Sequence, residues 1–462
     1  MDITKYNNIH LIGIGGINVS AIAKLLLSQN KNVFGFDLVE SDITIELQKL
    51  GANISIEEKL DLSQDIDLVI YSEAVPKDDK QREQANKSGI KEISAFEFWG
   101  EYAKDKKVIA VSGTNGKSST TAILGYILEQ AGFDPTVVVG TKVLQWNSNI
   151  RIGNSDWLVI EADEYHAHML EFNPDIAIIT NISADHLDFY KDIDDIKNHF
   201  QKWVNQIKPK GTLIINRDNK ISNELTADVE VKKIGIGGDK EIRSSGLTVH
   251  PAREDKLGVY RFNIIENDKD WGEVTYSIPG EFNVANSISA AIACNVAGVE
   301  TNIIRESLVS FKGTWRRFEL VGKYNKADIV SDYAHHPDAI KATLKAAREL
   351  YPFNKIIVLF EPHQHNRTKN LFDDFVGSFS EADEVIISEI YDVAGRTTQS
   401  DQKASSKDLV DAIKKSDSSK NITYAPDLNT AEKALKEKIE PENLVIVMGA
   451  GNVDVVARNL IK

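Results

Sequence analysis

The chain has 462 residues, of which 42% are hydrophobic and 27% are charged, and its formal net charge is −15. At roughly 100–200 residues per domain, this length suggests two to four domains of ordinary globular composition. An acidic chain without a basic cluster argues against a duplex nucleic-acid binder, and its single cysteine, Cys294, excludes an internal disulfide. No apolar run is long enough to span a membrane, and the first residues lack a signal-peptide pattern, so we expect a cytoplasmic protein.

The first block, residues 1–105, alternates short apolar runs with helical patterns. This alternation predicts βαβ units around a parallel sheet. The charged stretch 101–107 is interpreted as a linker. The expected elements are strands at residues 10–13, 32–37 and 66–71, with a helix at residues 21–28.

A glycine-rich loop, Leu-Ile-Gly-Ile-Gly-Gly-Ile-Asn, follows the first of these strands and opens the helix. Gly13 and Gly15 match a dinucleotide-binding fingerprint, and Asp37 follows about twenty residues later. Asn18 replaces the third glycine of that fingerprint. The loop therefore indicates a diphosphate-binding turn for NAD or a UDP-sugar, with a purely structural tight turn as the alternative.

A second α/β block covers residues 106–312. Between residues 246 and 278, short alternating runs predict a small antiparallel sheet. Residues 286–298 predict a buried helix. The expected strands of this block are residues 108–112, 157–161, 176–181 and 212–216.

The most informative stretch of this block is a phosphate loop between a buried strand and an apolar helix. Its glycines turn backbone N–H groups towards phosphate oxygens, and the helix N-terminus adds a positive dipole end. Lys117 would reach the β- and γ-phosphates, and Ser118 would offer its hydroxyl to Mg²⁺. Val111 stands where the general motif has glycine. The residues assigned to ATP here are Gly113, Thr114, Asn115, Gly116, Lys117, Ser118 and Ser119.

Acidic residues and a histidine follow two other strands of the block. Glu161 opens the motif Glu-Ala-Asp-Glu that ends at Glu164, and Asp185 precedes His186. These residues point to the sheet edge that carries the phosphate loop. One Glu, the Ser118 hydroxyl and ATP phosphates would suffice for a first Mg²⁺, and Glu161 with His186 could hold a second. On chemistry alone, His186 is equally well interpreted as structural, and no Cys/His spacing supports zinc.

A third α/β block covers residues 313–462. Its expected strands are residues 327–333, 355–360, 384–389 and 443–449.

Nine motifs, in order along essentially the whole chain, are together similar to those of the Mur ligases. They read HLIGIGGINVSAIA, GTNGKSSTT, EADE, TNISADHLDFY, PGEFNVANSISA, WRRFE, SDYAHHP, EPHQHNRT and MGAGNVDVVAR. The resemblance implies an α/β fold of three domains. These are a Rossmann-like domain over 1–105, a P-loop ATPase-like domain with a small antiparallel sheet over 106–312, and a second Rossmann-like domain over 313–462.

The resemblance also implies a role for individual residues. The uridine diphosphate part of a UDP-sugar would be bound by Gly13, Gly15, Gly16, Ile17, Asp37 and Ser72. The catalytic set would be Lys117, Glu161, His186, Arg317 and Asp332. Ser118, Glu161 and His186 would be the metal ligands. ATP would also contact Asn283, Asn286, Arg317 and Asp332. The amino acid would lie near Tyr333, His335, His363 and Arg367, and Arg367 would pair with its carboxylate.

The implied activity is that of an ATP-dependent ligase acting in peptidoglycan precursor synthesis, with ATP and Mg²⁺ as cofactors. It would join L-alanine to the carboxylate of UDP-N-acetylmuramate through an acyl phosphate. The alternatives are a ligase that attaches a recycled tripeptide, which the PHQHNRT motif disfavours, and an NAD oxidoreductase, which leaves the second phosphate loop unexplained. The sequence does not choose between His335 and His363 as the group that deprotonates the amine, and the oligomeric state stays open.

Five residues depart from the family pattern. They are Asn18, Val19, His166, Phe282 and Gln364. Gln364 matters most, because it lies in the presumed amino-acid pocket. It leaves L-alanine, glycine and serine open as the preferred amino acid.

Overall fold

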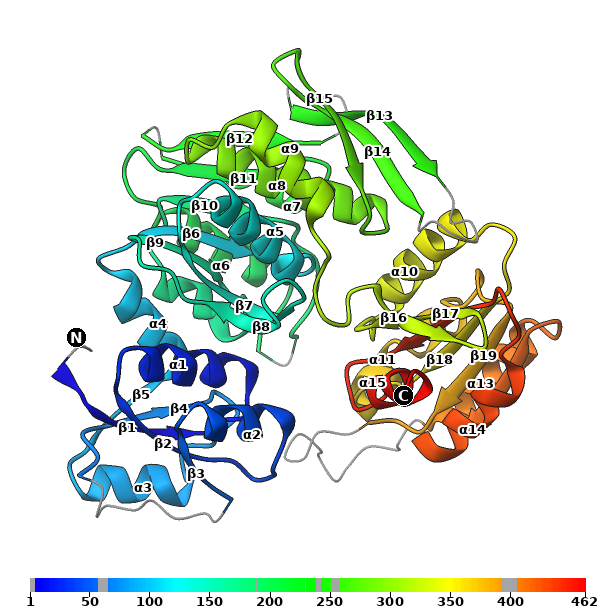
Figure 1. Cartoon of the computed structure of the whole chain (residues 1–462), viewed down its shortest axis with the longest axis horizontal. Coiled ribbons are helices and arrows are strands. Elements are labelled where there is room, and N and C mark those ends of the chain that lie inside the picture. Colours follow the sequence, from blue (N-terminus) through cyan, green and yellow to red (C-terminus); the bar gives the residue numbers. More distant parts are fainter. Residues whose placement is uncertain are drawn as a thin grey trace. The chain divides into compact units, whose positions relative to one another are not determined.

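A computed structural model describes residues 5–56, 65–187, 189–228, 230–237, 242–250, 258–391 and 405–462. The described residues form three β-sheets with helices packed on them (Figure 1). The chain divides into two compact units. The first contains residues 1–243, 265–271 and 285–308, and the second contains residues 244–264, 272–284 and 309–462.

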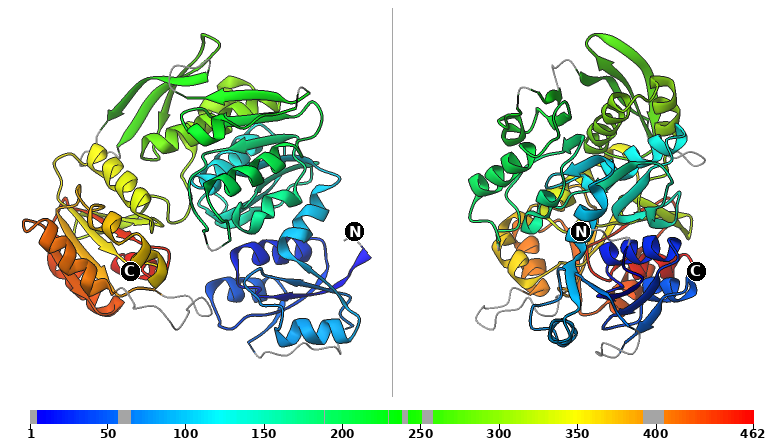
Figure 2. Two further views of the ribbon diagram at one scale, coloured as in Figure 1. Left: turned by 180° about the vertical axis from the view of Figure 1, so that it is seen from behind. Right: turned by 90° about the vertical axis from the view of Figure 1, so that its left-hand side faces the viewer.

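The first sheet has five parallel strands in the order β3-β2-β1-β4-β5. Helices α1 and α2 cover one of its faces and α3 covers the other (Figures 1 and 2). The chain therefore reverses direction across the sheet between β1 and β4, which is where ligands bind in open α/β sheets. The elements are β1 (Asn8–Ile12), α1 (Ile17–Ser28), β2 (Asn32–Phe36), α2 (Asp42–Lys49), β3 (Asn53–Ser55), β4 (Leu68–Tyr71), α3 (Lys80–Lys87), β5 (Lys91–Ser94) and α4 (Ala95–Ala103).

The second sheet has ten strands, in the order β15-β14-β13-β12-β11-β10-β6-β9-β7-β8. Strand β6 is parallel to both of its neighbours, β10 and β9, so α5 begins near the middle of the sheet. The strands are β6 (Lys107–Ser112), β7 (Thr136–Val143), β8 (Ser148–Arg151), β9 (Trp157–Glu161), β10 (Ile176–Ile179), β11 (Thr212–Asn216), β12 (Lys232–Ile236), β13 (Ile242–His250), β14 (Val259–Glu266) and β15 (Lys269–Tyr276). The helices are α5 (Lys117–Gln130), the 3₁₀ helix η3 (Tyr165–Glu171), α6 (Ile193–Val204), α7 (Lys220–Asn223), α8 (Glu281–Val296) and α9 (Thr301–Ser310).

The third sheet has six strands in the order β16-β17-β21-β18-β19-β20. Only the edge pair β16–β17 is antiparallel among these described strands. The elements are β16 (Glu319–Tyr324), β17 (Ala327–Asp332), α10 (Pro337–Leu350), β18 (Ile356–Phe360), α11 (His365–Asn370), α12 (Phe372–Val376), β19 (Glu384–Ser388), α13 (Ser406–Ser416), β20 (Asn421–Ala425), α14 (Leu428–Lys438), β21 (Leu444–Met448) and α15 (Asp454–Leu460).

Strands β14 and β15 form a hairpin through a two-residue turn. Both turn residues, Asn267 and Asp268, have positive φ angles of 47° and 61°. Such turns match the twist of paired strands, which explains the alternating pattern between residues 246 and 278. The expected small antiparallel sheet is therefore the outer end of the ten-stranded sheet.

The charged stretch 101–107, expected to be a linker, overlaps the last turn of α4. Ser94 and Glu97 form a reciprocal capping box that starts this helix. Phe98 and Trp99 are buried on its inner face. Charge alone predicted a linker, but the cap and the buried aromatic residues favour a helix.

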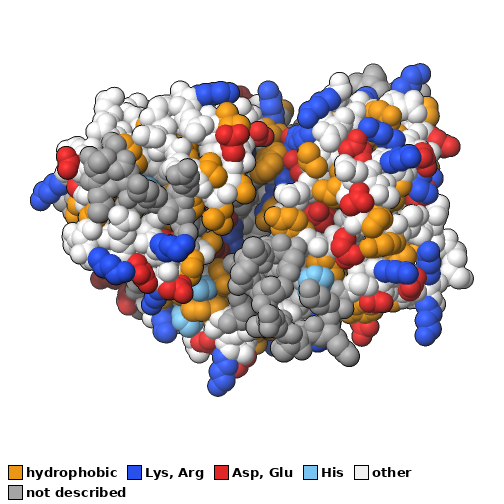
Figure 3. All heavy atoms as spheres, turned by 90° about the horizontal axis from the view of Figure 1, so that it is seen from below, with side chains coloured by type: hydrophobic (Ala, Val, Ile, Leu, Met, Phe, Trp, Pro, Cys, Tyr) orange, Lys and Arg blue, Asp and Glu red, His pale blue; other side chains and the backbone are white. Residues whose placement is uncertain are grey.

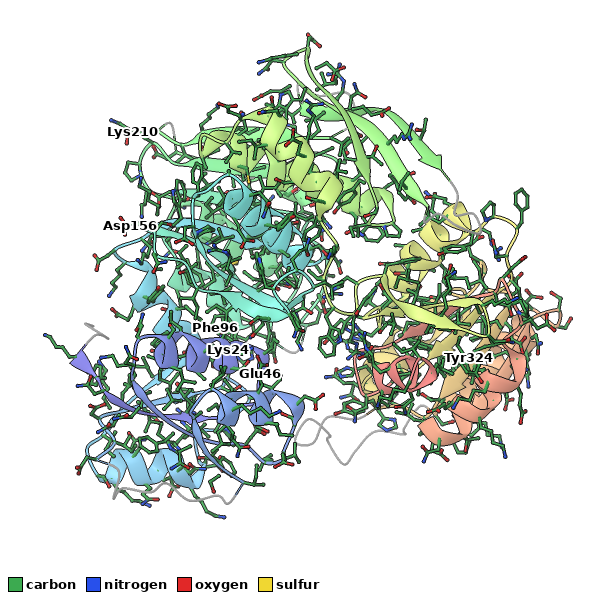
Figure 4. All side chains as sticks on the ribbon, in the orientation of Figure 1. Lys24, Glu46, Phe96, Asp156, Lys210 and Tyr324 are labelled. Atoms are coloured by element: carbon green, nitrogen blue, oxygen red, sulfur yellow. The ribbon has the colours of Figure 1, made fainter. Side chains whose placement is uncertain are left out.

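Lys24 ties helix α1 to two other elements, and Figure 4 labels it together with Glu46. Its Nζ lies 2.9 Å from the Glu46 carboxylate of α2. The same ammonium donates to Ser148 and Asn149 of β8, at 3.3 and 3.4 Å. Helix α1 thereby joins the first sheet to the edge of the second.

Acidic and basic side chains are interspersed on the face shown in Figure 3, in line with a sequence that has no basic cluster. Among the helices of the described ranges, none is long and apolar enough to cross a membrane.

Candidate active site

The first glycine-rich loop lies at the carboxyl end of β1. Gly13 has a φ of +77°, and its N–H donates to the Phe36 carbonyl at 2.8 Å. A Cβ at Gly13 would lie 2.9 Å from the Cβ of Ser72. Both the backbone conformation and the close approach of Ser72 therefore require glycine.

Asp37 stabilises this loop from the end of β2. Its carboxylate accepts hydrogen bonds from the N–H groups of Gly15 and Leu38, both at 2.8 Å. Gly16 then caps α1, and Ile17 is the first residue of that helix. The loop thus presents a helix N-terminus, suited to an anion, at the point where the strand order reverses.

The phosphate loop lies between β6 and α5, as predicted. Gly113 and Gly116 have φ angles of +133° and +87°. The loop is anchored on Asn181, whose backbone carbonyl accepts from Thr114 N–H at 2.9 Å and whose side chain accepts from Asn115 N–H at 3.1 Å. These bonds fix the backbone conformation of a turn of the kind that binds anions.

Asn286 of α8 lies directly against the phosphate loop. A Cβ at Gly116 would come within 2.5 Å of the Asn286 Oδ1. The structure therefore brings together these two residues, which were both predicted to contact ATP. Asn283, three residues earlier, donates through its side chain to the Pro279 carbonyl at 2.6 Å and supports the turn before α8.

Lys117 lies among carboxylates. Its Nζ donates to the Gly113 carbonyl at 2.9 Å and to Glu164 at 2.6 Å, and Asp163 lies 3.7 Å away. Burial disfavours the charged form, but the attraction of Glu164, Asp163 and Glu161 outweighs burial and raises the pKa of Lys117. The lysine is therefore a permanent cation at the point where a terminal phosphate would arrive.

Ser118 and Glu161 form a pair of oxygen donors beside this lysine. The Ser118 hydroxyl donates to Glu161 Oε1 at 3.1 Å, and Gly140 N–H donates to Oε2 at 2.7 Å. Burial raises the pKa of Glu161, although Lys117 opposes the shift. A hydroxyl and a carboxylate side by side suit Mg²⁺, which binds few protein ligands and completes its shell with phosphates and water. No group of three or more His, Cys, Asp or Glu residues in the described ranges could hold a metal alone.

His186 lies at the same sheet edge, with a φ of +53°. The nearest carboxylates to its Nε2 in the described part of the chain are Glu164 at 3.6 Å and Asp185 at 3.9 Å, rather than Glu161. Burial lowers the pKa of His186, but these neighbours raise it overall. The predicted pairing of His186 with Glu161 is therefore indirect in the structure, with Glu164 beside the histidine.

Glu164 is the residue of this site to which we assigned no role from the sequence. Its side chain is 3% exposed and lies between Lys117 and His186. Its backbone carbonyl accepts a hydrogen bond from the buried Tyr190 hydroxyl. The sequence did carry a signal for this residue. Three acidic residues stand within four positions at the end of a buried strand, whereas one metal ligand needs only a single acid.

In the second unit, Asp332 organises the end of β17. Its carboxylate is buried and accepts from the N–H groups of Phe318 and Ala334, at 2.7 and 2.8 Å. Burial raises its pKa, against these hydrogen bonds. The Arg317 guanidinium lies over the Tyr333 ring, 4.7 Å from its centroid, so the three predicted residues Arg317, Asp332 and Tyr333 share one site.

His335, His363 and Arg367 form the second part of this cluster. Arg367 Nη1 lies 3.3 Å from His363 Nδ1, and the two imidazole centroids are 5.7 Å apart. The His335 Nδ1–H donates to the Tyr333 carbonyl at 2.9 Å. Burial, reinforced by Arg367, lowers the pKa of His335 to about 3, so this imidazole is neutral at physiological pH.

Three family models match the chain in series. The Mur ligase family catalytic domain matches residues 8–107, the Mur ligase middle domain matches residues 111–294, and the Mur ligase glutamate ligase domain matches residues 316–451.

Curated relatives match nearly the whole chain. The UDP-N-acetylmuramate–L-alanine ligase of Caldanaerobacter subterraneus subsp. tengcongensis is 37% identical over 98% of this chain and 97% of its own length. The enzyme of the same description from Clostridium novyi is 38% identical, over 97% of this chain and 96% of its own length.

Solved structures have the same fold. The UDP-N-acetylmuramate-alanine ligase of Thermotoga maritima matches with a TM-score of 0.83 and 26% identity, over 98% of both chains. A murein peptide ligase from Psychrobacter arcticus matches with a TM-score of 0.73 and 23% identity, over 98% of both chains, which is a likeness of fold. With three family models in series and relatives at 37–38% identity over almost its full length, the chain belongs to the Mur ligase family.

Proposed function

We propose that the chain is an ATP-dependent ligase that joins L-alanine to the carboxylate of UDP-N-acetylmuramate, in cytoplasmic synthesis of peptidoglycan precursors. One observation carries the proposal. The chain has two separate glycine-rich loops of the kind that binds phosphate, at Gly13–Gly16 and at Gly113–Ser118, which follow strands of two different sheets. Two such loops suit two phosphate-bearing substrates, and the names of the curated relatives supply the substrate class. Family membership leaves the NAD oxidoreductase without support.

We divide the chain at residues 1–105, 106–312 and 313–462. This division is supported by the three sheets, since β1–β5, β6–β15 and β16–β21 fall into these segments in turn.

The chemistry begins at the phosphate loop. A carboxylate of the sugar substrate attacks the γ-phosphorus of ATP, ADP leaves, and an acyl phosphate forms. Such a transfer depends on positioning and charge neutralisation, and Lys117 and the α5 N-terminus provide fixed positive charge. Bound Mg²⁺, held by Ser118 and Glu161 with His186 nearby, would neutralise further phosphate charge.

The amine of the amino acid then attacks the acyl carbon, and phosphate leaves. The ammonium group of the amino acid must lose a proton before its nitrogen can attack. A base with a pKa near 3, such as His335, accepts this proton poorly at neutral pH. Arg367 always donates, so His363 Nδ1 accepts its N–H in this arrangement. When Arg367 turns to the carboxylate of the incoming amino acid, this nitrogen becomes available as the base. We therefore assign proton removal to His363.

The proposal is tested by measuring phosphate release from ATP and Mg²⁺ in the presence of UDP-N-acetylmuramate. L-Alanine, L-serine, glycine and the tripeptide L-Ala-γ-D-Glu-diaminopimelate are offered in parallel. We expect release with L-alanine and its loss in Lys117→Ala. Release with the tripeptide alone would move the assignment to the recycling ligase, and no release with any amine would refute the sugar acceptor.

A further inference from the structure

Glu164 is a buried carboxylate that is only half satisfied. One oxygen, Oε2, accepts from Lys117 at 2.6 Å. The other, Oε1, is buried and has no hydrogen-bond partner among the described residues. The His186 Nε2 lies 3.6 Å from this oxygen, beyond hydrogen-bonding distance. One carboxylate thus faces two residues assigned to nucleotide and metal.

We propose that Glu164 is a positioning residue that occupies Lys117 and makes the binding of ATP conditional on a divalent cation. The inference rests on the proposed function only in taking the phosphate loop as an ATP site. Glu164 holds the lysine in the place where a terminal phosphate would hold it, and a triphosphate must therefore displace this carboxylate.

Displacement leaves Glu164 buried and without its cation. A buried carboxylate that loses its partner is strongly unfavourable, and here the new neighbour would be an anionic triphosphate. A divalent cation entering with the nucleotide restores the balance of charge at Ser118, Glu161 and the free Oε1. ATP alone should therefore bind weakly, whereas ATP with the cation should bind tightly.

Asp163 provides a matched comparison. It carries the same charge one residue away, but its oxygen lies 3.7 Å from Lys117, and its side chain is 35% exposed against 3% for Glu164. If negative charge near the loop weakened ATP binding in general, removing either acid would tighten it. If the direct contact with Lys117 is the cause, only the removal of Glu164 should do so.

The test measures the dissociation constant of ATP by calorimetry, on the full chain, with EDTA and with excess Mg²⁺. We expect Glu164→Gln to lower the dissociation constant of ATP at least about tenfold in EDTA, and by less than about threefold in excess Mg²⁺. Glutamine keeps the shape of the side chain without its buried charge. Asp163→Asn should change both constants by less than about threefold, because its carboxylate is more exposed and more distant.

Equal tightening by the two variants, weaker ATP binding in Glu164→Gln, or equal tightening with and without Mg²⁺ would overturn the inference. If circular dichroism shows Glu164→Gln to be unfolded, Glu164→Asp decides the matter. Its shorter side chain should loosen the contact with Lys117, and unchanged cation-free binding would count against the inference. A wild-type chain that binds no ATP under either condition would refute the proposed function itself.

Discussion

At the scale of single residues, the pair Lys117–Glu164 contributes to folding as well as to binding. The side chains are 14% and 3% exposed and lie 2.6 Å apart. Removing one member of a buried pair leaves the other charged and unpaired, which costs far more than the pair contributes to stability. Replacing either residue should therefore affect the stability of the fold as well as the affinity for ATP.

Lys117→Ala should lower the free energy of unfolding by about 3 kcal/mol, because Glu164 is left buried without its cation. Lys117→Ala combined with Glu164→Gln should recover more than half of this loss. Urea denaturation of both variants checks the expectation. A double variant less stable than Lys117→Ala alone would show that the unpaired charge is not the cause.

His335 should make stability depend on pH. The folded chain keeps this imidazole neutral down to about pH 3, whereas in the unfolded chain it binds a proton near its ordinary pKa of 6.5. The unfolded state therefore binds more protons between these values, and stability falls as the pH drops through this range.

Between pH 7 and pH 4.5, we expect the wild-type chain to lose about 2 kcal/mol more unfolding free energy than His335→Gln. The variant replaces the imidazole with a side chain that does not titrate. Urea denaturation at both pH values measures the difference. Equal losses in the two proteins would mean that His335 is protonated in the folded chain.

Residue roles were only partly predictable from the sequence. The glycines and Lys117 stand in a strand–loop–helix context whose geometry is local, so their positions in the loop follow from spacing. Glu164 and His186 meet across two strand ends, and their distance depends on how β9 and β10 flank β6. That arrangement is tertiary, and spacing in the sequence does not contain it.

At the scale of elements, strands were predicted more accurately than helix boundaries. Strand β9 occupies the predicted residues 157–161, because a continuous apolar run ends at a charged motif. Helix α1 begins at Ile17, four residues before the predicted start. The first turn of α1 was missed because Asn18 and Ser20 are polar and interrupt the apolar pattern. In the structure, Ser20 is buried and its hydroxyl donates to the Ile17 carbonyl.

Asn18, a departure from the family pattern, joins two helices. Its side chain accepts a hydrogen bond at 2.7 Å from the indole N–H of Trp99 in α4, and that ring is buried. Asn18→Ala should reduce the unfolding free energy by about 1–2 kcal/mol, because a buried donor is left unpaired.

The affinity for UDP-N-acetylmuramate should change little in Asn18→Ala, by less than about threefold, since α1 keeps its helical backbone. Thermal denaturation and a binding titration on the same sample measure the two effects. A large loss of sugar-nucleotide affinity with unchanged stability would instead place Asn18 in the ligand site.

At the scale of the whole molecule, the two glycine-rich loops follow strands of two separate sheets. Asp37 fixes the first loop, and Lys117 lies in the second. Variants at these two residues should therefore act on different ligands.

Asp37→Ala should weaken the affinity for UDP-N-acetylmuramate by about tenfold, because two backbone N–H groups lose their acceptor and the loop loosens. Its affinity for ATP should stay unchanged. Lys117→Ala should do the reverse. Calorimetric titrations of each ligand into each variant test this, and equal losses of both ligands would indicate that the two loops serve one shared site.

The three-block α/β organisation was predictable because strand and helix patterns alternate throughout. The β7–β8 hairpin was not predicted from the sequence. In the structure, β7 is antiparallel to β8 and parallel to β9. The run of valines in β7 does not alternate with polar residues, so periodicity alone did not distinguish this strand from a buried helix segment.

The contacts of Lys24 have a consequence for the way the chain opens to solvent. The Lys24 ammonium group bonds α1 to both α2 and β8, so α1 cannot leave without breaking its bonds to both elements. Backbone amides in α1 and β8 should therefore exchange with deuterium at a common free energy, as one cooperative unit, although more than a hundred residues separate them in the sequence.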